Sequence, residues 1–88
     1  MTKLEQKLQE LGYLLEYRRT YWSKLVEIGV FQYGTSIIIG VNDNKTKITY
    51  YGVYPNQYEL INERGQLEVL LKAFNEMQND LEILKECE

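Results

Sequence analysis

The sequence contains no histidine and a single cysteine, Cys87. Without an imidazole, the chain has no Ser-His or Cys-His nucleophile pair and no histidine ligand for a metal. Cys87 lies between Glu86 and Glu88, where no neighbouring base would activate its thiol. One cysteine also cannot form a disulfide within the chain. We therefore predict a protein that is not an enzyme and binds no metal or other cofactor.

Long apolar runs are also missing. The longest uncharged apolar stretch lies within residues 28–41, where glycines and polar residues interrupt it, whereas a membrane span needs about 20 apolar residues. The first twelve residues carry charges throughout, which is not typical of a signal peptide. With 44% hydrophobic and 26% charged residues, the composition is that of one globular domain over residues 1–88. We expect a cytoplasmic protein that contacts no membrane.

Apolar residues at helical spacing predict a helix near each end of the chain. Thr2 and Glu5 form a capping box at the start of a helix over residues 2–11, and Gly12 is suited to its C-terminal cap. At the other end, a three–four spacing predicts a longer helix. Its apolar face comprises Leu67, Leu70, Phe74, Met77, Leu81 and Leu84, widened by Val69, Leu71, Ala73 and Ile83. We expect this face to pack on a sheet, with helix pairing in a homodimer as the alternative.

Residues 37–54 predict a β-hairpin. Ile37, Ile39 and Val41 alternate on one face of its first strand, and Asn42–Lys45 supplies residues that tolerate turn conformations. A short stretch further on, Tyr58–Ile61, is a candidate edge strand. The hairpin therefore forms the centre of the predicted sheet.

Residues 13–28 allow two interpretations. Their aromatic and β-branched residues favour strands on either side of a turn at Arg18-Arg19. A four–three spacing from Leu4 to Leu25 would instead suit one helix reaching about residue 27. Because Gly12 is unfavourable inside a helix, we prefer the strands. The predicted fold class is α+β: an antiparallel sheet of three to five strands with an N-terminal helix and a longer C-terminal helix packed on it.

Two groups of residues are candidates for binding a partner. The first surrounds the predicted turn and contains the types that dominate protein interfaces: Tyr17, Arg18, Arg19, Tyr21 and Trp22. The second belongs to an acidic final third, in which residues 59–88 carry eight carboxylates against three basic groups; we select Glu76, Asp80 and Glu82. The structural alternatives are tyrosines that cover the sheet and a solvated helix face.

Two resemblances can be stated. The segments LEQKLQELGY (4–13) and AFNEMQNDLEILK (73–85) resemble the ends of short unassigned proteins from phages and mobile elements of Gram-positive bacteria. This resemblance covers about a quarter of the chain, carries over no functional residue, and implies an accessory protein that binds and blocks host machinery. The helix–strands–helix order also resembles the double-stranded RNA-binding domain. The stretch ERGQLE (63–68) departs from the basic start of that family's second helix, so its binding residues do not transfer.

The predicted function is therefore a small non-catalytic protein-interaction module. We expect it to bind a protein partner, and a second copy of the chain is one candidate for that partner. The alternative is a nucleic-acid or nucleotide binder in which Arg18, Arg19, Trp22 and nearby tyrosines stack bases. The acidic isoelectric point of about 5.0 argues against a groove that follows a phosphate backbone.

Overall fold

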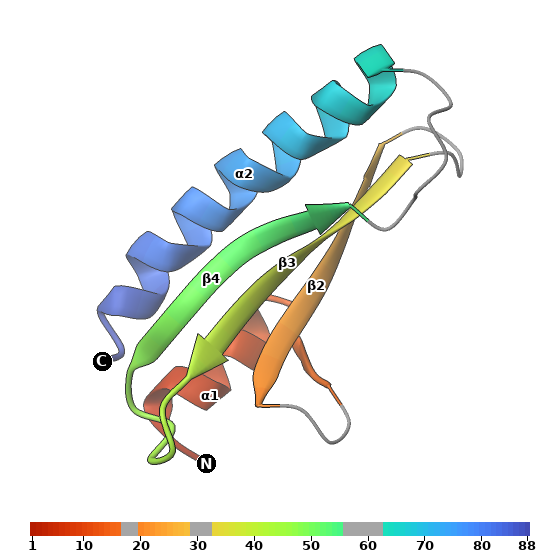
Figure 1. Cartoon of the computed structure of the whole chain (residues 1–88). Coiled ribbons are helices and arrows are strands. Elements are labelled where there is room, and N and C mark those ends of the chain that lie inside the picture. The colour runs from red at the N-terminus through yellow and green to blue at the C-terminus, as the bar shows by residue number, and fades with distance from the viewer. Residues whose placement is uncertain (17–19, 29–32, 56–62) are drawn as a thin grey trace.

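The computed structural model describes residues 1–16, 20–28, 33–55 and 63–88 (Figure 1). In chain order the elements are α1 (Lys3–Glu10), β1 (Leu14–Leu15), β2 (Tyr21–Ile28), β3 (Tyr33–Val41), β4 (Ile48–Pro55) and α2 (Glu63–Lys85). The strands form one antiparallel sheet of four, in the order β1-β2-β3-β4. This confirms the predicted α+β fold with a short N-terminal and a longer C-terminal helix. Within the described ranges, neither helix is long and apolar enough to cross a bilayer.

Both ends of α1 form as the sequence predicts. The hydroxyl of Thr2 accepts a hydrogen bond from the Glu5 amide at 3.1 Å, and the Glu5 carboxylate accepts one from the Thr2 amide at 3.2 Å. At the other end, Gly12 adopts a left-handed φ of 96°. The amide of Tyr13 then donates to the carbonyl of Leu8 at 2.9 Å, completing a Schellman motif. The helix therefore ends before residue 12, and the continuous helix to residue 27 does not form.

The turn between β3 and β4 is held by the Asn42 side chain. Its Oδ1 accepts hydrogen bonds from the amides of Thr46 at 2.8 Å and Lys47 at 3.1 Å. Lys45 has a left-handed φ of 60°, and its carbonyl accepts a bond from the Thr2 hydroxyl at 2.6 Å. The predicted hairpin and its turn are thus confirmed, and the turn is tied to the start of α1. The candidate strand Tyr58–Ile61 lies outside the described residues.

Both helices pack on one face of the sheet, which we call the covered face (Figure 1). The core lies between this face and the helices. Its buried side chains come from α1 and the residues after it (Leu4, Leu8, Tyr13), from β2 (Trp22, Val26), from β3 (Ile37, Ile39, Val41) and from α2 (Ala73, Met77, Leu81, Leu84). Strand alternation sends the intervening residues of β2, β3 and β4 to the opposite side, which we call the open face.

The buried side of α2 differs from the predicted one. Leu67 and Phe74 are 57% and 47% exposed, whereas Val69 and Ala73 are 1% and 0% exposed. Placing Leu67 and Phe74 in the packed stripe was therefore wrong. The helix carries two overlapping apolar stripes, and the sheet packs against the one that contains Val69 and Ala73. Met77, Leu81 and Leu84 are buried as predicted.

Candidate interaction surface

The predicted tyrosine–arginine–tryptophan cluster does not form one surface. Trp22 is 2% exposed and belongs to the core, so its expected position at an exposed turn was wrong. Tyr21, the preceding residue of β2, has the opposite orientation and lies half-buried on the open face. Tyr17, Arg18 and Arg19 lie outside the described residues. Of the predicted group, Tyr21 is the member that the structure places on an accessible face.

The predicted acidic surface is also divided. Asp80 is 6% exposed, and its Oδ2 accepts hydrogen bonds from the Tyr13 hydroxyl at 2.8 Å and from Lys24 Nζ at 2.6 Å. Glu76 lies 3.5 Å from the same ammonium, while Glu82 is exposed. The expectation of one exposed acidic face was wrong, because Asp80 and Glu76 turn toward a lysine of the sheet.

That lysine is the centre of a largely buried polar network. Lys24 Nζ also donates to the Leu11 carbonyl at 3.0 Å and lies 4.6 Å from the centre of the Tyr13 ring. Burial, the hydrogen bond to Asp80 and the nearby carboxylate charges together raise the pKa of Tyr13 above its ordinary value, so its hydroxyl stays a donor. The network joins β2, the end of α1 and α2. Because Asp80, Glu76 and Leu11 all engage the ammonium, we assign Lys24 a structural role.

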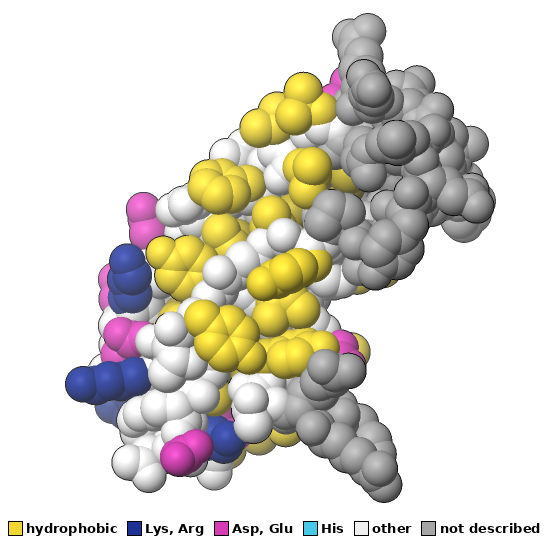
Figure 2. Space-filling view, viewed as in Figure 1, with side chains coloured by type: hydrophobic (Ala, Val, Ile, Leu, Met, Phe, Trp, Pro, Cys, Tyr) yellow, Lys and Arg dark blue, Asp and Glu magenta, His cyan; other side chains and the backbone are white. Residues whose placement is uncertain are grey.

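The open face carries a group of apolar and aromatic side chains that we call the open-face cluster. Its members are Tyr21 and Leu25 from β2, Ile38 from β3, and Tyr50 and Tyr54 from β4. Leu25, Tyr50 and Tyr54 are 53%, 45% and 56% exposed. Figure 2 shows hydrophobic side chains gathered over the sheet and continuing along α2. A contiguous apolar surface of this kind is typical of an interaction site rather than of a bare monomer surface.

Glycines shape this cluster. Tyr50 pairs with Gly40 across β3 and β4, and its ring lies so close that a Cβ atom on Gly40 would overlap it. A Cβ atom on Gly52 would come 3.3 Å from the Tyr54 ring. The two tyrosine rings therefore lie against the backbone of the sheet. Between them, Tyr21 and Ile38 line a shallow hollow of about 330 Å³.

The charged side chains around the open-face cluster are acidic in the described part of the strands. Glu27 is exposed on this face, next to Leu25 and Gly34. Glu16 accepts a hydrogen bond from the Ser23 hydroxyl at 2.5 Å and so lies at the β1 side of the same face. The face therefore combines aromatic and apolar groups with two acidic side chains on its β1–β2 side, while Lys72 of α2 donates to the Glu27 carbonyl at 3.0 Å.

A second exposed apolar group lies on α2. Leu67, Leu71 and Phe74 follow one another at helical spacing and are 57%, 54% and 47% exposed. This stripe is the position at which the predicted helix pairing of a homodimer would occur. It extends over two turns of the helix, which is shorter than the three to four heptads of an independent coiled coil.

The chain matches no family model, no curated protein and no solved structure with which it was compared. In the ranges that the structure describes, no group of three or more acidic or cysteine side chains is arranged to hold a metal ion. Function therefore has to be argued from the geometry of the surfaces. The sequence signal for the open-face cluster is the two-residue spacing of Tyr50, Gly52 and Tyr54, which places the three residues on one face of β4.

Proposed function

We propose that this protein is a non-catalytic protein-interaction module whose partner docks on the open-face cluster. The observation that carries the proposal is the uneven covering of the sheet: both described helices lie on one face, and the other presents tyrosines and aliphatic side chains to solvent. Tyrosine is among the residue types enriched at interface hot spots. Its ring buries a large area while its hydroxyl remains able to form a hydrogen bond.

The charge around the cluster favours a protein partner over a nucleic acid. Single-stranded nucleic acids bind to aromatic platforms that are accompanied by cations, because the phosphates must be neutralised. Here the neighbouring side chains in the described strands are Glu16 and Glu27. They would repel phosphates and would favour a partner that surrounds an apolar patch with lysine or arginine. The nucleic-acid alternative would depend on Arg18 and Arg19, which are not among the described residues.

We further propose that the module acts as an accessory protein or inhibitor carried by a phage or mobile element and works in the cytoplasm. This proposal rests on the resemblance stated for the terminal segments 4–13 and 73–85. A small domain that presents one preformed surface is suited to blocking a site on a larger protein, since an interface of standard size needs only about 800 Å² from each side.

The test compares two double variants with matched chemistry. Leu25→Ser/Tyr54→Ser removes exposed apolar groups from the open face, and Leu67→Ser/Leu71→Ser does the same on α2. Proteins crosslinked to the wild-type chain in host cells are identified by mass spectrometry, and the purified partner is then titrated with all three proteins. We expect the open-face variant to bind at least about tenfold more weakly, a loss of about 1.4 kcal/mol, and the α2 variant to bind like the wild type.

Two results would contradict the proposal, and a third would assign a separate role to the α2 stripe. Equal binding by the open-face variant, with circular dichroism showing that it is folded, would exclude the cluster as the interface. Binding that nuclease treatment abolishes, or that falls steeply with salt, would favour the nucleic-acid alternative. Loss of self-association in the α2 variant alone, measured by analytical ultracentrifugation, would assign that stripe to a homodimer instead.

A further inference from the structure

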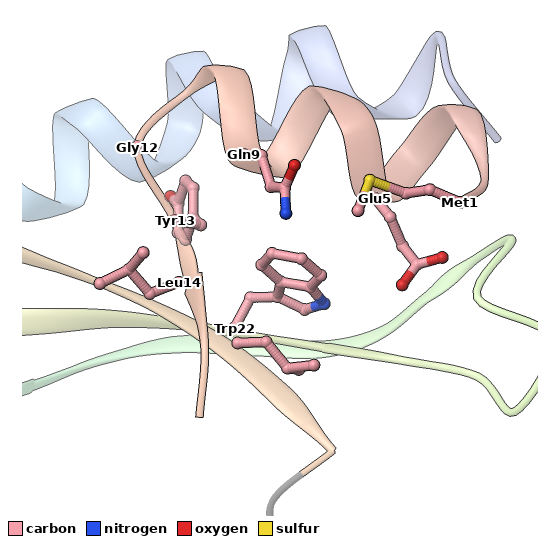
Figure 3. A pocket seen from close by; sticks show the side chains of 8 residues that line it. Met1, Glu5, Gln9, Gly12, Tyr13, Leu14 and Trp22 are labelled. Atoms are coloured by element: carbon pink, nitrogen blue, oxygen red, sulfur yellow. The ribbon is translucent and has the colours of Figure 1, made fainter. Parts of the chain in front are cut away.

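A separate pocket lies on the covered side of the sheet, between α1 and the edge formed by β1 and β2 (Figure 3). Its volume is about 360 Å³, within the range of small-molecule sites. The side chain of Trp22 forms its inner wall, Glu5 and Gln9 line it from α1, and Met1 and Leu15 lie at its border. The pocket and the open-face cluster therefore lie on opposite sides of β2.

The indole of Trp22 provides a hydrogen-bond donor that is not used within the protein. Its Nε1 is buried, and no acceptor for it exists in the described ranges. An indole nitrogen can only donate, and a buried donor without an acceptor is unfavourable relative to one that is hydrogen-bonded. Figure 3 shows the indole below Gln9, with its nitrogen on the side of the pocket where Glu5 lies. A bound molecule with an acceptor at this position would satisfy the Trp22 donor.

The other lining residues restrict the chemistry of that molecule. One oxygen of Glu5 is occupied by the Thr2 amide and hydroxyl at 3.2 and 3.4 Å, and the carboxylate makes the pocket unfavourable for anions. The Gln9 side chain is exposed, and its amide can donate or accept. At the border lie the apolar side chains of Met1 and Leu15, which are 73% and 53% exposed.

We propose that this pocket binds a small uncharged amide, with a compact apolar body against Met1 and Leu15. The carbonyl oxygen of the ligand accepts a hydrogen bond from Trp22 Nε1. The amide N–H of the ligand donates to Glu5 or Gln9, which face the indole from α1 (Figure 3). An anionic ligand would be repelled by Glu5. A simple alkylammonium has no acceptor atom and would leave the Trp22 donor unpaired.

The chain contains one tryptophan, so a single indole N–H signal in an ¹H–¹⁵N NMR spectrum reports on the pocket. The full chain is titrated with three probes of similar size: caprolactam, cyclohexylammonium and cyclohexanecarboxylate. We expect caprolactam to shift the Trp22 signal saturably and downfield, as a new hydrogen bond requires, and the two charged probes to bind at least tenfold more weakly. Tyr54→Ser, on the open face, is the control and should bind caprolactam like the wild type.

Two variants test the assignment of the donor and of the pocket. Trp22→Phe keeps an apolar ring but removes the donor, and should weaken caprolactam binding at least tenfold in a ligand-detected saturation-transfer experiment. If this core variant does not fold, Leu15→Arg places a charged chain at the half-exposed border, keeps the indole signal, and should also abolish the saturable shift. Equal shifts from all three probes, or no saturable shift with caprolactam at molar excess, would overturn the proposal. The Trp22 Nε1 donor would then form a hydrogen bond with water only.

Discussion

The covered and open faces of the sheet are built from the same strands but use their apolar residues differently. On β3, Ile37 and Ile39 are completely buried beneath the helices. On the opposite side, Leu25 and Tyr54 keep more than half of their surface in contact with solvent, at 53% and 56%. The folding free energy of the domain therefore comes mainly from one face. The apolar residues of the other face contribute little to the core, which leaves them available for a partner.

The largest loss of folding stability is expected for a substitution in β3, where the two faces can be compared at adjacent residues. Ile39→Asp places a carboxylate in the core, where its desolvation costs several kcal/mol against a total stability of roughly 5–10 kcal/mol. The variant should show no cooperative thermal transition by circular dichroism. Ile38→Asp is the matched control, because Ile38 is the residue before Ile39 in β3, lies on the open face and is only half-buried. If both variants melt alike, the two faces do not differ as the structure indicates.

The next effect concerns the polar network of the covered face. Asp80→Asn removes the charge that pairs with Lys24 at 2.6 Å and accepts from Tyr13. The substitution leaves the buried ammonium with only the more distant Glu76 carboxylate at 3.5 Å, so we expect a loss of roughly 3 kcal/mol in urea denaturation. Glu82→Gln changes an exposed carboxylate of the same helix and should alter stability by less than about 0.5 kcal/mol. Equal effects would mean that the network is not buried in solution.

A smaller effect is expected at alkaline pH. Tyr13 has a raised pKa in the folded protein, so above its ordinary pKa of 10.0 the unfolded chain releases this proton first. Stability should therefore fall as the pH rises above that value, by at most about 1.4 kcal/mol per pH unit for this group. Tyr13→Phe should show a shallower dependence, measured by urea denaturation between pH 8 and pH 11. An identical slope in the variant would show that the hydroxyl is not protected in the fold.

The smallest effect is expected on the exposed side of α2. The sequence pattern predicts that Phe74→Asp unfolds the domain, but the side chain is 47% exposed. We therefore expect a loss of only about 1 kcal/mol, since no charge becomes buried. Met77→Asp, on the buried side of the same helix, should abolish the cooperative transition. If the Phe74→Asp variant failed to fold, the result would support the helix orientation predicted from the sequence, in which Phe74 packs on the sheet.

Local signals predicted the elements well. The capping box at Thr2, the glycine after α1 and the Asn42 turn each specify a conformation through a few neighbouring residues, and each forms as expected. The choice between faces could not be predicted in the same way. Tyr21 and Trp22 are both large and aromatic, so alternation shows that they point in opposite directions but not which one the helices cover.

The candidate site was missed for a related reason. Asp80 was assigned to the surface because it belongs to the acidic final third of the chain, whereas its partners Lys24 and Tyr13 are 56 and 67 residues away in the chain. The orientation of α2 depends on the same long-range contacts. The open-face cluster is likewise assembled from three strands whose registers are set only in the folded sheet.

The glycines beneath the two open-face tyrosines have a consequence for the thermodynamics of binding. Because the Tyr50 ring lies against Gly40 and the Tyr54 ring against Gly52, the rotamers of both side chains are restricted before any partner arrives. Ordering a mobile side chain at an interface costs about 0.5–1.5 kcal/mol in conformational entropy. The free protein has already met part of that cost during folding. The face should therefore bind with a less unfavourable entropy than an equally aromatic surface of freely rotating tyrosines.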